Sequence, residues 1–160
     1  MTIFVDSSVL VEYLKGNNDL FLKLLKARLA YARLRYAFNA AVLNEFLFYY
    51  LAVESKKAPL TIKRNKLIQS VLSGTGYKAV LRQVHYLPDH PTFAEKVPDL
   101  MALYNLLPSD AFILATCRHH HVRYLATLDT DFSIPCTAEA ISIINDESTL
   151  REAVRQMLPD

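Results

Sequence analysis

The stretch IFVDSSVLVEYLKG, residues 3–16, decides the fold class of this chain. Its first three residues are apolar and two of them are β-branched, which is typical of a short buried strand. Asp6 ends the strand, and Ser7 and Ser8 follow it as a polar turn. Apolar residues then continue to Gly16, where a helix C-cap is expected. The stretch therefore predicts a strand, a turn and a short helix.

The same alternation of strands and helices continues along the chain. Further strands are predicted at 35–38, 86–87, 122–128 and 141–144, and helices at 18–32, 40–55, 60–72, 77–85, 91–105, 108–118 and 148–157. Pro98 is expected to kink or break its helix. Strands that alternate with helices form a parallel sheet through right-handed crossovers. We therefore predict an α/β fold, a three-layer sandwich with a short central parallel sheet flanked by helices.

Length and composition bound the class of protein. A chain of 160 residues, 52% of them hydrophobic, is expected to form one domain over 1–160 rather than a disordered chain. The formal net charge of +2 indicates no particular partner. No apolar run approaches the roughly 20 residues that span a bilayer, and residues 3–16 do not resemble a signal peptide. We expect a cytoplasmic protein that does not associate with membranes, with Cys117 and Cys136 as reduced core residues.

The scarcity of glycine excludes two common kinds of phosphate site. Only Gly16, Gly74 and Gly76 occur, so the chain has no GxxxxGK[ST] loop. The pair at 74 and 76 has no third glycine and follows no predicted strand, so it does not form a dinucleotide-binding motif. It is interpreted as a turn between helices.

Four acidic residues occupy positions that the predicted topology could bring together. Asp6 and Asp129 follow predicted strands, and ligand sites in parallel sheets form at the carboxyl ends of strands. Asp110 lies in the first turn of an apolar helix, and Glu45 lies among large apolar residues. Carboxylates that converge repel one another, and a divalent cation relieves that repulsion. An all-oxygen donor set favours Mg²⁺ or Mn²⁺ over zinc and is suited to phosphodiester hydrolysis.

Each acid also has a purely structural interpretation. Asp6 could cap the helix that follows it, and Asp110 could interact with a helix dipole. Asp129 could be a turn residue, as could Asp131. Glu45 could lie on an exposed stripe of its helix. These alternatives remain open at the level of the sequence.

Four segments together resemble the PIN-domain family and, within it, the VapC-type toxin ribonucleases. They are IFVDSSVLVEYL, AAVLNEFLFYY, LPSDAFILATCRHHHV and YLATLDTDF, in this order along the chain. The resemblance implies a helix-flanked parallel sheet and Mg²⁺- or Mn²⁺-dependent endonucleolytic cleavage of RNA. It also implies a homodimer and a small antitoxin protein as partner.

The resemblance assigns roles to individual residues. The catalytic residues and metal ligands it implies are Asp6, Glu45, Asp110 and Asp129. Asp131 is either a fifth acid or a residue that only holds the loop. Thr127 and Ser8 match small polar positions that support metal-bound water in similar proteins. The segment 60–87 matches no motif of the family.

Two other functions are consistent with parts of the sequence. A PIN fold could serve as a non-catalytic RNA- or protein-binding module, because fold does not determine function. The Asp-Thr-Asp at 129–131 also resembles an aspartyl-phosphate motif, but that chemistry needs a downstream lysine and none follows Lys96.

Several conspicuous groups of side chains have ordinary interpretations. Two basic groups, Lys23, Lys26, Arg28, Arg33 and Arg35, and Lys56, Lys57, Lys63, Arg64 and Lys66, are either solvated helix faces or RNA contacts. The histidines at 119–121 are interpreted as a helix C-terminal cluster, because consecutive helical residues cannot all face one ion. Tyr49 and Tyr50 are interpreted as core or dimer contacts.

Overall fold

Five parallel strands form the centre of the protein in a computed structural model, which describes residues 1–157. They are β1 (Thr2–Val5), β2 (Arg35–Phe38), β3 (His85–Tyr86), β4 (Tyr124–Ala126) and β5 (Ser142–Ile144). The strand order is β3-β2-β1-β4-β5, and every neighbouring pair is parallel. The prediction of a short parallel sheet is confirmed.

The strand β1 lies in the middle of the sheet, with β2 on one side and β4 on the other. Ile3, Phe4 and Val5 are completely buried. The chain builds outward from β1 in both directions, first to β2 and β3 and then to β4 and β5. The order therefore reverses beside β1, and crevices for ligands form at such a switch point, outside the carboxyl ends of the strands.

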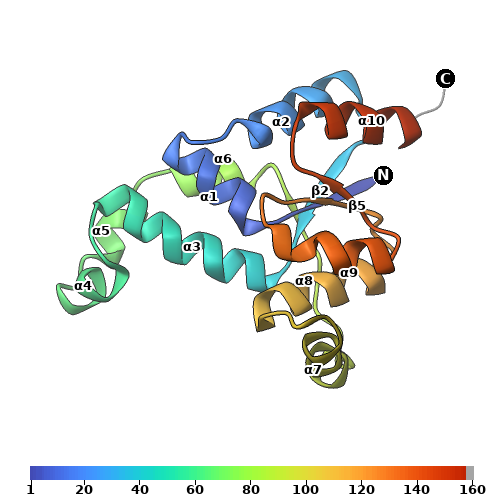
Figure 1. The fold of residues 1–160 in the computed structure, drawn as a ribbon. Coiled ribbons are helices and arrows are strands. Elements are labelled where there is room, and N and C mark those ends of the chain that lie inside the picture. Colours follow the sequence, from blue (N-terminus) through green and yellow to red (C-terminus); the bar gives the residue numbers. More distant parts are fainter. Residues whose placement is uncertain (158–160) are drawn as a thin grey trace.

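Helices cover both sides of the sheet, as predicted. They are α1 (Ser7–Lys15), α2 (Leu20–Ala30), α3 (Ala40–Ser55), α4 (Pro59–Arg64), α5 (Ile68–Leu72), α6 (Gly76–Leu81), α7 (Phe93–Tyr104), α8 (Pro108–His119), α9 (Ser133–Ala138) and α10 (Glu147–Met157), with a 3₁₀ helix η1 (Thr130–Phe132). Figure 1 shows α2 and α10 together on one side of the sheet, and α8 and α9 on the other. Within residues 1–157, no single helix has the length and hydropathy of a membrane crossing, although the bent pair α7 and α8 meets both criteria when counted together.

Local signals placed several helix ends correctly. Gly16 adopts the left-handed conformation, with φ of 73°, at the end of α1. The side chain of Asn39 accepts a hydrogen bond from the Val42 amide and so caps α3. Pro108 is the first residue of α8, whose interior is buried as its apolar sequence predicted. Cys117 and Cys136 are buried and unbridged, and burial raises the pKa of the Cys136 thiol to about 12.

Other predicted elements were wrong in their bounds. The helix expected at 60–72 is divided into α4 and α5, because the chain turns at Lys66, which has a φ of 56°. The helix expected at 77–85 ends at Leu81, and His85 belongs to β3. The strand expected at 122–128 is only three residues long, since its ends leave the sheet to reach α8 and η1.

The region around Pro98 also differs from the prediction. Pro98 lies inside α7, which is continuous from Phe93 to Tyr104, so the expected break does not occur. A proline removes one backbone donor, and this proline is exposed, so only one bond of the helix is lost at the surface. The helix α9, which contains Pro135, was not predicted at all.

Candidate metal centre

Asp6 stands at the carboxyl end of β1, at the switch point of the sheet. It is only 4% exposed, and its amide donates to the carbonyl of Ala126 at 2.9 Å. It occupies the N-cap position of α1, but its side chain makes no capping hydrogen bond. Its oxygens instead accept from the hydroxyls of Ser8 at 2.6 Å and Thr127 at 2.8 Å. The interpretation of Asp6 as a helix cap is therefore wrong.

Ser8 and Thr127 hold the ends of two neighbouring strands together. The Ser8 hydroxyl accepts from the Leu128 amide at 3.0 Å, and the Thr127 hydroxyl accepts from the Asp129 amide at 3.0 Å. Each hydroxyl thus donates to Asp6 and accepts from the loop after β4. These two contacts set the position of Asp129 relative to Asp6.

Glu45 reaches the same place from α3. The Ser7 hydroxyl, which is almost fully buried, lies 2.7 Å from Glu45 Oε2 and 3.2 Å from Asp6 Oδ1. Glu45 itself is half-buried and lines the same cavity as Asp6. The role of Ser7 was not predicted. The available signal was a second hydroxyl residue directly after the strand's terminal acid.

Three further acids complete the group. The carboxylate oxygens of Asp110, Asp129 and Asp131 lie within 4.8 Å of one another. Asp129 Oδ1 also accepts from the Asp131 amide at 2.9 Å, so Asp129 holds its turn as well as facing the group. Asp131 is exposed, whereas the other two are half-buried.

The pKa of the Asp110 carboxyl depends on its burial and on the nearby negative charges of the other four acids. Burial and the negative charges of Asp129, Asp6, Glu45 and Asp131 raise the pKa of this carboxyl to about 6. The Asp110 carboxyl is thus affected by acids from the ends of two strands, from α3 and from the 3₁₀ helix η1. We expected from the sequence that four acids would converge, and the structure brings them together: Asp6, Glu45, Asp110 and Asp129.

Four of the five acids, all except Asp131, line a cavity of about 210 Å³. Its lining is Asp6, Ser7, Ser8, Val11, Glu12, Lys15, Glu45, Tyr49, Asp110 and Asp129. Lys15 lies at the rim, where its Nζ is 2.7 Å from Glu12 Oε1 and 5.7 Å from the centre of the Tyr49 ring. The two neighbouring tyrosines differ: Tyr50 is buried in the core, but Tyr49 is 40% exposed and lines the cavity. The interpretation of Tyr49 as a core residue is therefore wrong.

The donor set fits a hard divalent cation. Within residues 1–157, none of the five acids forms an ion pair with a lysine, arginine or histidine. All of their donor atoms are carboxylate oxygens, which Mg²⁺ and Mn²⁺ prefer. A cation here would offset the repulsion that raises the pKa of Asp110. Asp110, Asp129 and Asp131 form a group of potential ligands, and Asp6 and Glu45 line the same cavity as Asp110 and Asp129.

The histidines at 119–121 lie elsewhere and play no part in this arrangement. His119 ends α8, and its ring lies 4.4 Å from the ring of His90, centre to centre. In the described part of the chain, the acidic triad is the one group of three potential ligands close enough to share an ion. The interpretation of these histidines as a helix C-terminal cluster agrees with this placement.

Comparisons with known proteins agree with the fold. A family model described as the PIN domain matches residues 3–136. Ribonuclease VapC2 of Methanocaldococcus jannaschii is 26% identical over 141 residues, which cover 88% of this chain and 93% of the relative. Ribonuclease VapC6 of the same organism is 27% identical over 139 residues, with 81% and 90% covered.

Two solved structures share the fold. A toxin–antitoxin complex from Klebsiella pneumoniae has a chain that superposes with a TM-score of 0.56 at 19% identity, covering 89% of this chain and 96% of that one. A chain of VapBC2 from Rickettsia felis, solved bound to a DNA fragment from its promoter, gives a TM-score of 0.61 at 16% identity. That match covers 92% of this chain and all of the other.

Proposed function

This chain belongs to the PIN-domain family, and from that premise we propose that it is a divalent-metal-dependent endoribonuclease that hydrolyses RNA phosphodiester bonds, the toxin of a toxin–antitoxin pair. The observation that carries the proposal is the position of Asp110, where burial and the convergence of four other acids raise the pKa of its carboxyl to about 6. The likeness to two VapC ribonucleases along most of their length supports the choice of RNA as substrate.

We propose Asp6, Glu45, Asp110 and Asp129 as the catalytic acids and the metal ligands, with Asp131 as a supporting acid. A bound Mg²⁺ or Mn²⁺ would polarise the scissile phosphate and lower the pKa of a coordinated water. The Ser7 hydroxyl donates to Glu45 Oε2, and Oε1 of that carboxylate accepts no hydrogen bond from residues 1–157. Glu45 or Asp129 is the proposed acceptor of the proton that the attacking water loses. Ser8 and Thr127 keep Asp6 in a fixed orientation through their hydroxyls.

The proposal extends to partners and assembly. The relatives carry the names of toxin ribonucleases, and one structural neighbour is a toxin–antitoxin complex. These names support a small antitoxin protein as partner of this chain. A homodimer, a single domain over 1–160 and a cytoplasmic location stay predictions.

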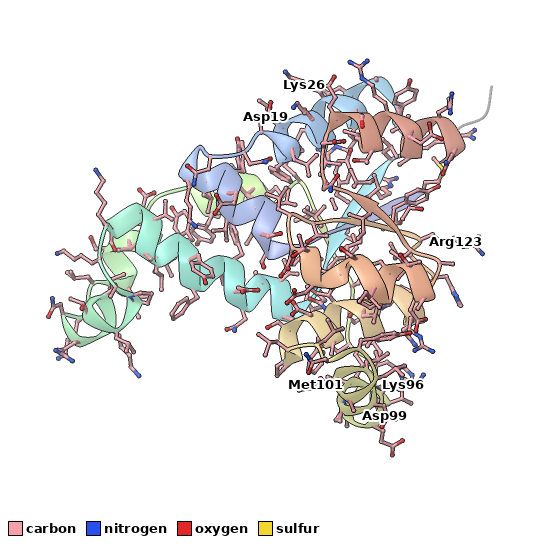
Figure 2. The ribbon with its side chains drawn as sticks, in the orientation of Figure 1. Asp19, Lys26, Lys96, Asp99, Met101 and Arg123 are labelled. Carbon is pink, nitrogen blue, oxygen red and sulfur yellow. The ribbon has the colours of Figure 1, made fainter. Side chains whose placement is uncertain are left out.

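Cleavage of an unstructured RNA by the purified protein tests the proposal. Wild type should cleave in Mg²⁺ or Mn²⁺ and stop when EDTA is added, whereas Asp6→Asn and Asp110→Asn should be inactive. Asp99→Asn is the matched control, because Asp99 is an exposed acid on α7, away from the cavity, as Figure 2 shows. Full activity in both site variants would contradict the proposal.

The products provide a second test of the chemistry. Attack by water is expected to leave a 5′-phosphate on the downstream fragment. A 2′,3′-cyclic phosphate would show that the ribose 2′-hydroxyl had attacked, and that result would contradict the hydrolytic assignment.

A further inference from the structure

A second charged region overlaps the segment 60–87, which matches no motif of the family. Between Ser55 and Pro88 the sequence contains seven lysines and arginines and no acidic residue. Because the whole chain has a net charge of +2, the remainder carries −5. The charge of the molecule is therefore divided between one positive helical segment and a negative remainder that holds the acidic cavity.

The positive charge is densest in residues 56–66, which we call the basic arm. It consists of α4 with the turns before and after it, and its cations are Lys56, Lys57, Lys63, Arg64 and Lys66. All five side chains are exposed, and none forms an ion pair with any residue in 1–157. Five unpaired cations within eleven residues form a concentrated positive surface.

The arm is held in place by packing and hydrogen bonds. Ile62 of α4 is completely buried, and α4 packs against α3. At the start of the arm the Ser55 hydroxyl donates to the Leu51 carbonyl at 2.7 Å and accepts from the Lys57 amide at 3.2 Å. Its cations are therefore presented by a fixed scaffold, which lowers the entropy cost of binding a ligand.

Two of the five cations occupy backbone positions that do not favour lysine. Lys56 has a φ of 54° and Lys66 a φ of 56°, in the left-handed region where glycine and asparagine are the usual residues. Asn105, His121 and Ala140 have the same left-handed conformation, so the backbone at these two lysines does not by itself indicate a function. The two lysines are left unchanged in the test below.

The helix α3 connects the arm to the acidic cavity. Glu45 lies in the cavity and Lys56 follows the last residue of α3, so the two positions are about 16 Å apart at a rise of about 1.5 Å per residue. Tyr49 lies one turn from Glu45 on the same side of the helix, because residues four apart share a face. Figure 1 shows α4 and α5 at the end of α3 that is distant from the sheet.

We propose that the basic arm binds the phosphate backbone of the same RNA strand whose scissile bond enters the acidic cavity. The inference rests on the proposed nuclease function. The acidic cavity repels a polyanion, so productive binding needs cations nearby, and Lys15 at its rim is already paired with Glu12. An acidic protein could also bind five cations, but the path along α3 past an exposed tyrosine fits a continuous single strand better.

A triple substitution tests the arm without touching its two strained lysines. The arm variant is Lys57→Gln, Lys63→Gln and Arg64→Gln. The control is Lys26→Gln, Lys96→Gln and Arg123→Gln. These cations are exposed, form no ion pair with residues 1–157, and lie on α2, on α7 and before β4, as Figure 2 shows. Both sets remove two lysines and one arginine, so the total charge of the two variants is equal.

Binding is measured by fluorescence anisotropy with an unstructured RNA of about 16 nucleotides, in an Asp6→Asn background that does not cleave it. The arm variant should bind about tenfold more weakly, and the slope of log K against log salt should fall by about 2, at about 0.7 per lost phosphate contact. The control should stay within about twofold of its parent in affinity. Equal losses in the two variants would overturn the proposal.

Two further measurements establish what the arm binds and whether the arm variant keeps an intact cavity. If polyglutamate displaces the RNA as well as unlabelled RNA does, the arm is a site for an acidic protein and the proposal is wrong.

In the cleaving background, the arm variant should hydrolyse a dinucleotide at the wild-type rate, because that substrate cannot reach the arm. A slower rate would indicate a structural defect and would also overturn it. Absence of cleavage by wild type would contradict the nuclease function instead, and the binding comparison is measured independently of it.

Discussion

The hydroxyl of Ser7 donates a hydrogen bond of 2.7 Å to Glu45, a residue 38 positions further along the chain. The same hydroxyl lies 3.2 Å from Asp6 Oδ1. It therefore stands between two carboxylates that arrive from different elements, β1 and α3. A neutral donor at this point reduces the repulsion between the two acids and sets how far apart they are held.

Loss of the Ser7 hydroxyl should weaken the metal centre without unfolding the protein. We expect Ser7→Ala to bind Mg²⁺ or Mn²⁺ about 10-fold more weakly, because side chains that orient metal ligands typically contribute this much. Calorimetric titration of the metal measures the effect. Ser73→Ala, at an exposed serine after α5, is the control, and equal affinity in Ser7→Ala and wild type would contradict the prediction.

We expect Thr127 to stabilise the protein through the hydrogen bonds of its hydroxyl rather than through the shape of its side chain. It is 1% exposed, and its hydroxyl both donates to Asp6 and accepts from the Asp129 amide. Thr127→Val leaves both partners short of a hydrogen bond, so we expect a loss of about 1–3 kcal/mol in the free energy of unfolding. Chemical denaturation measures it. Thr127→Ser, which keeps the hydroxyl, should retain most of this stability, and a serine variant as unstable as the valine one would argue against the role.

The raised pKa of Asp110 predicts how stability depends on pH in the absence of metal. Its carboxyl has a pKa of about 6 in the folded protein and about 3.8 as a reference, so the fold favours the protonated form. Between these two values the folded state binds more protons than the unfolded state, and its stability falls as the pH rises. In EDTA, wild type should lose stability over this interval relative to Asp110→Asn.

At neutral pH and without metal, Asp110→Asn should therefore be more stable than wild type. Added metal should stabilise the variant less than it stabilises wild type. Thermal unfolding at several pH values, with EDTA and with Mn²⁺, checks both parts. Metal should raise the midpoint of wild type, because the ion binds only the folded state, and should raise that of the variant less. A pH dependence in EDTA that is identical for the two proteins would show that Asp110 does not titrate as described.

Tyr49 should contribute to RNA binding through its ring. It lines the cavity and is 40% exposed, and stacking of a base on an aromatic ring contributes about 1–3 kcal/mol. We expect Tyr49→Ala to raise KM for a short RNA by about tenfold with little change in kcat, and Tyr49→Phe to behave as wild type. Steady-state kinetics check this. Tyr31→Ala removes a similarly exposed tyrosine outside the cavity and should have no effect.

Sequence alone determined the elements whose ends depend on neighbouring residues. The apolar run before Asp6, the cap Asn39 and the proline at 108 act within a few positions of the chain. For that reason α3 and α8 begin where they were predicted, and β1 ends where it was predicted. The acids at the strand ends could be identified in the same way. The division of 60–72 into two helices could not, because a lysine at a left-handed position carries no local signal, unlike the glycine at 16.

Which side chains meet depends on the tertiary fold. The contact between Ser7 and Glu45, the position of Tyr49 in the cavity and the separation of the basic arm from the acids all depend on the strand order β3-β2-β1-β4-β5 and on how α1 packs against α3. That order results from burying apolar faces along the whole chain at once. Helix caps and turns act over a few residues, whereas burial involves the whole chain. For that reason the residues of the site could be named from the sequence, but their geometry could not.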